Sequence, residues 1–210
     1  MIYLVRHGQT DWNVEGRNQG RTDIELNETG IKQAEETAKK LEGKKFDKVF
    51  SSPLKRAYKT AQIICDDHIV LDKRLIERCN GDLEGKLRSE YKDLVNFADP
   101  NENRHGIEPL PVFRKRITDF FDFILQTYPG KDILVVTHAG ISIYAKCYFE
   151  GEPKDGDYSN YKLKNCQVLQ YENDLEHNKF YKVKIISNVN NEVNGVINYW
   201  FYYSFKLYLW

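Results

Sequence analysis

The sequence predicts an α/β protein with a three-layer α/β/α arrangement, in which helices cover both faces of a mainly parallel central sheet. Short apolar runs alternate with segments whose apolar residues recur at helical spacing. Two runs, 2–5 and 133–137, are almost wholly apolar, as in strands buried on both faces of a parallel sheet. The length of 210 residues suits one ordinary core, and no internal repeat divides it.

The first elements follow from these patterns. A strand at Ile2–Val5 leads into a polar loop, Gln9–Asn27. An amphipathic helix over Thr29–Leu41 ends before Gly43, because glycine readily adopts the left-handed backbone that closes helices. A short strand, Phe46–Ser51, comes next.

The middle of the chain is less regular. Pro53 suits the first turn of a helix over Leu54–Cys65. Ile69–Leu71 is a brief strand, and the loop-rich stretch Cys79–Gly106 contains one predicted helix, Ser89–Phe97.

A long helix follows, because apolar residues recur at helical spacing from Phe113 to Leu125 and Pro129-Gly130 ends the pattern. The remaining predicted elements are a strand at Ile133–Thr137, a helix at Gly140–Phe149, and closing strands at Val168–Tyr171 and Phe180–Ile186.

The composition is that of a soluble globular protein, with 41% hydrophobic and 30% charged residues. A formal net charge of zero provides no global field for nucleic acid or anionic membrane, so any affinity for anions must be local. The four cysteines show no metal-ligand spacing, and the chain opens directly on a strand. We therefore expect reduced thiols and a cytoplasmic protein.

The end of the chain differs in kind. Residues 1–186 are predicted to form one domain, and residues 187–210 an Asn-rich linker and a tail of unknown role. Eight of the last fifteen residues are aromatic: Tyr199, Trp200, Phe201, Tyr202, Tyr203, Phe205, Tyr208 and Trp210. The tail could dock on its own domain or mediate self-association as a homodimer. Membrane contact is disfavoured, because Lys206 is its only charge.

Chemically useful side chains stand at three strand ends. Arg6 and His7 follow the first strand, His138 follows the strand at 133–137, and Arg56 begins the helix after a third strand. Ligands of open α/β sheets bind at the carboxyl ends of strands, so these groups should share one rim. Singly, a histidine there is more often structural and the arginine more often solvated. Their convergence favours a phosphate site.

The residue types suit cleavage of a phosphate ester. Neutral imidazole can attack phosphorus, so His7 can be the nucleophile, and nearby arginines keep its ring neutral. The planar fork of Arg6 suits two phosphate oxygens. Arg56 lies in the first turn of a helix, where the backbone dipole also favours an anion. An acid must protonate the leaving group, but composition does not choose between Glu77 and Glu84.

Several segments closely resemble the histidine phosphatase superfamily, in its phosphoglycerate mutase-like branch of short bacterial phosphatases. They are Tyr3–Asn13, Gly16–Asp23, Leu26–Gly30, Ser51–Ala57 with Thr60-Ala61, Leu75–Glu77 with Gly81–Gly85, and Val135–Gly140. The resemblance covers residues 1–150 and implies that 1–186 is a catalytic domain of that family.

The resemblance also implies roles. His7 would be phosphorylated in a covalent intermediate, and Glu77 would protonate the leaving oxygen and then assist water. Glu84 is interpreted as structural. The expected phosphate and substrate contacts are Arg6, Asn13, Gln19, Gly20, Arg56, His138 and Ala139. No metal and no cofactor is implied, because two arginines would repel a divalent cation and no nucleotide-binding loop occurs.

Three functions remain open from the sequence. A phosphatase acting on a small phosphorylated metabolite is favoured, because the mutases carry a long arginine-bearing insertion between Glu77 and His138 that this chain lacks. Arg114 and Arg116 do lie between Glu77 and His138, but they belong to a helix whose apolar face is assigned to the core, and they do not form such a cluster. A mutase using 2,3-bisphosphoglycerate is the second candidate, and a non-catalytic binder of phosphorylated ligands the third. Substrate candidates are sugar phosphates, phosphoglycerates and α-ribazole phosphate. Gly106-Ile107-Glu108-Pro109 lacks a serine that many relatives carry, so any substrate contact of that serine is in doubt.

Overall fold

A computed structural model describes residues 1–174 and 179–186, and the predicted linker and aromatic tail lie outside the described residues. The described chain forms one sheet with strand order β3-β2-β4-β1-β5-β6. The strands are β1 (Ile2–Arg6), β2 (Lys48–Ser51), β3 (Ile69–Leu71), β4 (Ile133–Thr137), β5 (Val168–Asp174) and β6 (Lys179–Ile186). The first four in sequence run parallel, while β5 pairs antiparallel with β1, and β6 pairs antiparallel with β5 at the edge of the sheet.

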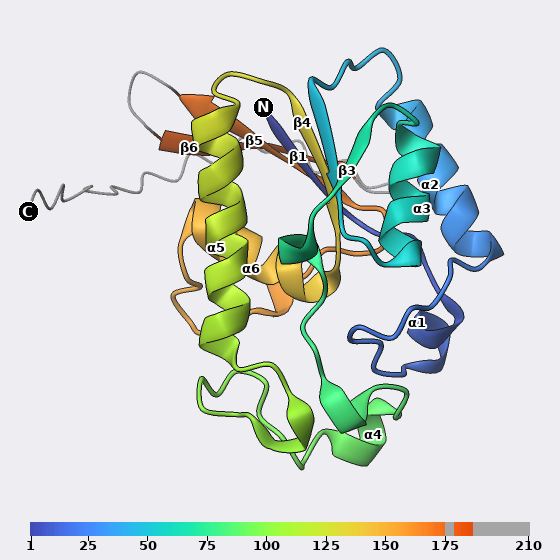
Figure 1. The fold of residues 1–210 in the computed structure, drawn as a ribbon, viewed down its shortest axis with the longest axis vertical. Helices are drawn as coiled ribbons and strands as arrows, with labels where there is room; N and C mark the ends of the chain where they lie inside the picture. The colour runs from blue at the N-terminus through green and yellow to red at the C-terminus, as the bar shows by residue number, and fades with distance from the viewer. Residues whose placement is uncertain (175–178, 187–210) are drawn as a thin grey trace, which may run out of the picture.

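The three-layer prediction is confirmed. Helices α2 (Glu28–Lys40) and α3 (Lys55–Ile64) lie together on one face, and α5 (Leu110–Thr127) and α6 (Ala139–Glu150) cover the other (Figure 1). The alternation of strand side chains produces this division. Leu4 and Val135 join the core under α5 and α6, whereas their neighbours Val5 and Val136 pack with α3.

Two local predictions were wrong. The polar loop after β1 contains a short helix, α1 (Asp11–Glu15), which begins with a capping box between Thr10 and Asn13. The helix predicted over Ser89–Phe97 is only α4 (Arg88–Tyr91). Beyond it the chain is held as a loop, in which the Phe97 carbonyl accepts from Arg78 and the Asn96 N–H donates to Glu102.

The remaining elements are 3-10 turns: η1 (Lys73–Leu75), η2 (Gly81–Leu83), η3 (Arg104–Gly106) and η4 (Ser159–Tyr161). Between η2 and the residue that follows η3, Leu83, Val95 and Ile107 form a small separate apolar cluster. None of the described helices is long and apolar enough to cross a bilayer.

Candidate active site

The carboxyl ends of β1, β4 and β2 bring the three predicted junctions together. β4 lies between β1 and β2, with all three strands parallel. The His7 N–H donates to the Thr137 carbonyl at 2.9 Å, and the rings of His7 and His138 have centroids 5.2 Å apart. Parallel register therefore places both imidazoles side by side at one rim, as the sequence predicts.

The contacts of His7 leave one of its two ring nitrogens with a free electron pair. Its side chain is buried, and Nδ1 lies 2.7 Å from the Gly8 carbonyl. A carbonyl only accepts, so Nδ1 carries the proton and Nε2 of the neutral ring has the free electron pair. Burial, followed by the charges of Arg56 and Arg6, lowers the pKa of His7 well below its usual 6.5. The ring is therefore uncharged at neutral pH.

His138 is fully buried at the N-cap of α6. Its Nε2 lies 2.7 Å from the Ser52 hydroxyl, while Nδ1 is buried without a hydrogen-bond partner among the described residues. Burial and the charge of Arg56 hold the pKa of His138 well below its ordinary value. Ser52 lies in the Ser51–Ala57 motif, which assigned it no role, and it orients the second imidazole from the end of β2.

Arg6 and Arg56 present two cations in this rim. Arg6 Nη1 donates to the Leu163 carbonyl at 2.8 Å, and Arg56 donates to the carbonyls of Gly20 and Thr22, each at 2.8 Å. The Nε of each guanidinium is buried with no partner among the described residues. Burial lowers the pKa of both arginines to about 10, so both stay charged at neutral pH. Buried cations with unused donors provide what an anion requires.

Glu77 approaches the same rim from the segment after η1. One carboxylate oxygen accepts a hydrogen bond from the backbone N–H of Arg78 at 2.8 Å, and the other accepts from the backbone N–H of Gly140 at 2.9 Å. A Cβ on Gly140 would lie 2.5 Å from the Glu77 carboxylate. Position 140 must therefore be glycine for this carboxylate to rest on the first turn of α6, two residues from His138.

The loop carrying Gln19 and Gly20 is shaped by Glu84. This carboxylate accepts hydrogen bonds from the N–H groups of Arg21, Thr22 and Asn80. Gly20 has φ +48°, and a Cβ there would lie 2.1 Å from Glu84. The structure thus gives Glu84 the structural place interpreted from the sequence.

The remaining predicted contacts lie near His7 and His138 along the chain. Asn13 accepts from the Asn165 amide at 3.2 Å, and the same amide donates to the His7 carbonyl at 2.9 Å. Asn165, from the turn before β5, was missed because no periodicity or charge pattern marks it. Gln19 has a buried amide oxygen without a partner among the described residues, and Ala139 is the first residue of α6.

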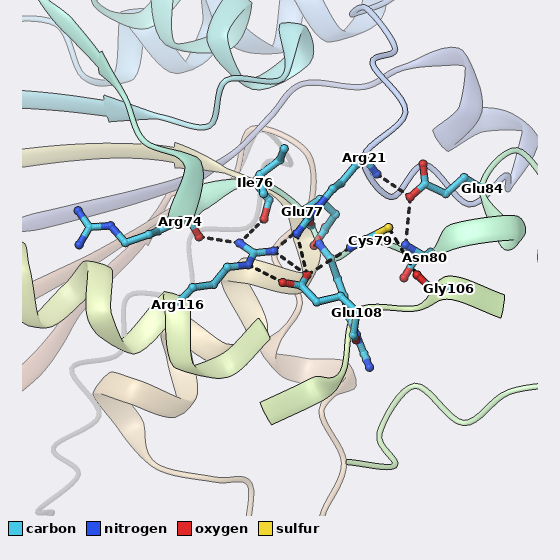
Figure 2. A network of polar contacts seen from close by, with 11 residues as sticks. Arg21, Arg74, Ile76, Glu77, Cys79, Asn80, Glu84, Gly106, Glu108 and Arg116 are labelled. Carbon is cyan, nitrogen blue, oxygen red and sulfur yellow. Dashed lines mark hydrogen bonds and ion pairs between the residues drawn. The ribbon is translucent and has the colours of Figure 1, made fainter. Parts of the chain in front are cut away.

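Arg116 makes contacts that the sequence did not reveal. It lies with Arg114 on α5, the helix that the sequence assigns to the core. Arg114 does pair with Glu152 near the surface, but Arg116 reaches from α5 to the Glu77 carbonyl and the Glu108 carboxylate (Figure 2). A long side chain can leave the face of its own Cβ, which helical spacing alone does not reveal. Among the described residues, no three His, Cys, Asp or Glu side chains are grouped as metal donors.

The two depressed histidine pKa values predict a stability that depends on pH. Below about 6.5 the unfolded chain binds protons that folded His7 and His138 reject, so the free energy of unfolding falls as the pH drops. Each site contributes about 1.4 kcal/mol per pH unit in that range. Urea unfolding from pH 7.5 to 5 should show this dependence of the free energy of unfolding on pH. His7→Gln should reduce the slope by the contribution of one histidine, about 1.4 kcal/mol per pH unit. An unchanged slope in the variant would contradict the assignment.

Comparisons with known proteins agree with this geometry. Residues 2–185 match the family model of the histidine phosphatase superfamily, branch 1. "Phosphoglycerate mutase-like protein 4" of Arabidopsis thaliana is 38% identical over 160 residues, covering 69% of this chain and 70% of that protein. "Uncharacterized phosphatase PhoE" of Bacillus subtilis is 39% identical over 148 residues, covering 69% and 74%.

A solved structure gives the same result. The phosphoserine phosphatase of Entamoeba histolytica in complex with 3-phosphoglyceric acid superposes with a TM-score of 0.74 and 27% identity, covering 90% of this chain and 97% of that chain. The resemblance found in the sequence motifs is thereby confirmed, and with it the phosphoglycerate mutase-like fold. The chain belongs to the histidine phosphatase superfamily, branch 1, and is an enzyme of its phosphatase type.

Proposed function

We propose that this enzyme hydrolyses a small phosphomonoester through a phosphohistidine at His7, without a metal ion. One observation carries the proposal. The buried neutral ring of His7 lies within the field of two buried arginines whose Nε donors have no partner among the described residues. A phosphoryl group placed there would satisfy those donors while exposing its phosphorus to Nε2.

The steps follow from the side chains. The electron pair of His7 Nε2 attacks phosphorus, and the bond from phosphorus to the ester oxygen breaks. Glu77 gives its proton to the leaving oxygen, so the product departs as an alcohol. Arg6 and Arg56 balance the charge on the phosphoryl oxygens. The Glu77 carboxylate then takes a proton from water as the water oxygen attacks phosphorus, and the bond to Nε2 breaks to release phosphate.

Phosphoserine or a phosphoglycerate is the substrate class we favour. The Entamoeba relative is named for the first and was solved with the second. This chain also offers a cation beyond the phosphate pocket, because exposed Lys162 directly precedes the carbonyl of Leu163 that binds Arg6. Desolvation by the surrounding protein atoms and the positive charge of Arg6 lower the pKa of Lys162. A substrate carboxylate would relieve that repulsion.

The other substrates suggested by the sequence have weaker support. A structure described as a "putative alpha-ribazole-5'-P phosphatase" of Escherichia coli has the same fold at 23% identity, which is a likeness of fold alone. Phosphoglycerate mutase activity remains a second candidate through the mutase-like relative, although the short segment between Glu77 and His138 favours hydrolysis. We also propose residues 1–186 as the catalytic domain, because the family model matches residues 2–185.

The experiment is phosphate release from phosphoserine, 3-phosphoglycerate, glucose 6-phosphate and α-ribazole phosphate, each with excess EDTA or with Mg²⁺. We expect turnover unaffected by EDTA and kcat/KM highest for phosphoserine or 3-phosphoglycerate. Loss of all activity in EDTA would contradict the metal-free mechanism. Conversion of 3-phosphoglycerate to 2-phosphoglycerate with added 2,3-bisphosphoglycerate, faster than phosphate release, would favour the mutase. Phosphate release by chains ending at residue 186 would support the domain boundary.

A further inference from the structure

Two arginines from distant segments converge on the backbone of Glu77. Arg21 Nε donates to the Glu77 carbonyl at 3.2 Å, and Arg116 Nη2 donates to the same oxygen at 3.1 Å. Both guanidiniums also contact Glu108, Arg21 at 3.1 Å and Arg116 at 2.9 and 3.0 Å (Figure 2). The carboxylate thus lies between the two cations that hold the Glu77 carbonyl.

Arg116 fixes the path of the chain into Glu77. Besides its two-pronged contact with Glu108, its Nη1 donates to the carbonyls of Arg74 and Ile76 at 2.6 and 2.5 Å. Burial alone would raise the pKa of Glu108, but Arg116, Arg21 and the Cys79 N–H together lower it, so this carboxylate stays charged. A mostly buried ion pair of this kind has a defined geometry, because the planar guanidinium fork matches the carboxylate.

Arg21 connects the contacts around Glu77 with Arg56, one of the two arginines proposed to bind phosphate. Its neighbours Gly20 and Thr22 supply the two carbonyls that hold Arg56. Its own N–H is held by Glu84 at 2.9 Å. One three-residue loop therefore contacts Arg56 on one side and the Glu77 backbone on the other.

We propose that Arg21, Glu108 and Arg116 form a positioning network that sets the distance of the Glu77 carboxyl from the leaving oxygen and keeps it in register with Arg56. The proposal rests on the proposed role of Glu77 as the acid. None of the three touches the reacting atoms in this arrangement. They act through the backbone of Glu77, and a small displacement of a catalytic group can reduce its rate enhancement strongly.

The basicity of the leaving group separates positioning from general damage. Phenolate must be protonated as it leaves, whereas p-nitrophenolate is a stable anion and gains little from an acid. A displaced Glu77 should therefore slow phenyl phosphate selectively. The comparison uses kcat/KM, which reports the steps through departure of the leaving group and not the later attack of water.

The test compares Arg21→Met with Arg17→Met, a control in the same loop whose exposed side chain pairs with Glu15 and donates to the Gly85 carbonyl, without a contact to Glu77 or Glu108 among the described residues. Glu77→Gln is the reference and should lose about 100-fold on phenyl phosphate, with far less loss on p-nitrophenyl phosphate. Arg21→Met should lose about 10-fold on phenyl phosphate and at most about twofold on p-nitrophenyl phosphate. Arg21→Lys should recover only part of the loss, since lysine lacks the fork. Arg17→Met should behave as wild type.

Arg116→Lys provides a second variant, with Arg114→Lys as its control on the same helix. Equal losses on both esters, or no loss on either, in folded Arg21 and Arg116 variants would overturn the positioning role while leaving Glu77 as the acid. If Glu77→Gln instead lost kcat/KM equally on both esters, Glu77 would not be the acid, and this inference would fail with that role. If p-nitrophenyl phosphate turnover survives His7→Ala, the proposed function itself fails.

Discussion

We expect His7→Ala to abolish both turnover and the phosphoenzyme. The free electron pair of His7 Nε2 is the proposed nucleophile, because Nδ1 of the same ring is held at the Gly8 carbonyl. Loss of a covalent nucleophile costs about 10⁴-fold or more in kcat. The measurement is rapid acid-free quenching with p-nitrophenyl phosphate, followed by mass spectrometry of the peptide containing residue 7.

His68→Ala is the control for this variant. His68 also belongs to a segment that enters a strand, but its side chain is 99% exposed and pairs only with Asp67 among the described residues. It should retain wild-type activity and the label on His7. A His7→Ala protein that still carries acid-labile phosphate at another residue would refute the assignment of the nucleophile.

Arg56→Lys should be the second most damaging change, lowering kcat/KM by about 100- to 1000-fold. Lysine keeps the charge but lacks the planar fork, so its compact ammonium cannot reproduce the directions in which the guanidinium reaches the Gly20 and Thr22 carbonyls and presents Nε. The effect should appear in kcat/KM for every ester, because the phosphoryl group is common to all of them. That uniform loss contrasts with the leaving-group selectivity expected for Arg21.

Lys55→Met is the matched control, since Lys55 precedes Arg56 in the same helical turn and pairs at the surface with Glu25. It should stay within about twofold of wild type, as surface ion pairs contribute little. Activity of Arg56→Lys within threefold of wild type would show that a simple positive charge suffices. The two-carbonyl clamp would then be structural only.

The sequence predicted the fold and the centre of the site well because both depend on local patterns. Apolar runs 2–5 and 133–137 specify buried parallel strands, and a parallel sheet aligns the residues that follow them. His7, His138 and Arg56 could thus be brought together without coordinates. The three-layer arrangement follows from the same alternation of strand side chains.

What the sequence did not reveal depends on contacts across the chain. Ser52, Asn165 and Arg116 act through hydrogen bonds to partners far away in sequence, and no spacing rule encodes those partners. The short helix α1 depends on the Thr10 cap rather than on periodicity, so it looked like loop. Only the family resemblance distinguishes Glu77 from Glu84. The Glu77 carboxylate is held by the N–H of Gly140 at the start of α6, and this contact between distant segments cannot be read from the sequence.

The central place of β1 has a consequence for how the protein folds. This strand joins β4 on one side and β5 on the other, both encoded much later in the chain. Contacts between distant segments form slowly, because loop closure must precede their gain in energy. The surroundings of His7, the proposed nucleophile, are therefore complete only once these distant strands have paired. We expect phosphohistidine-forming ability to return only in the final phase of refolding, after α2 and α3 have acquired their helical signal.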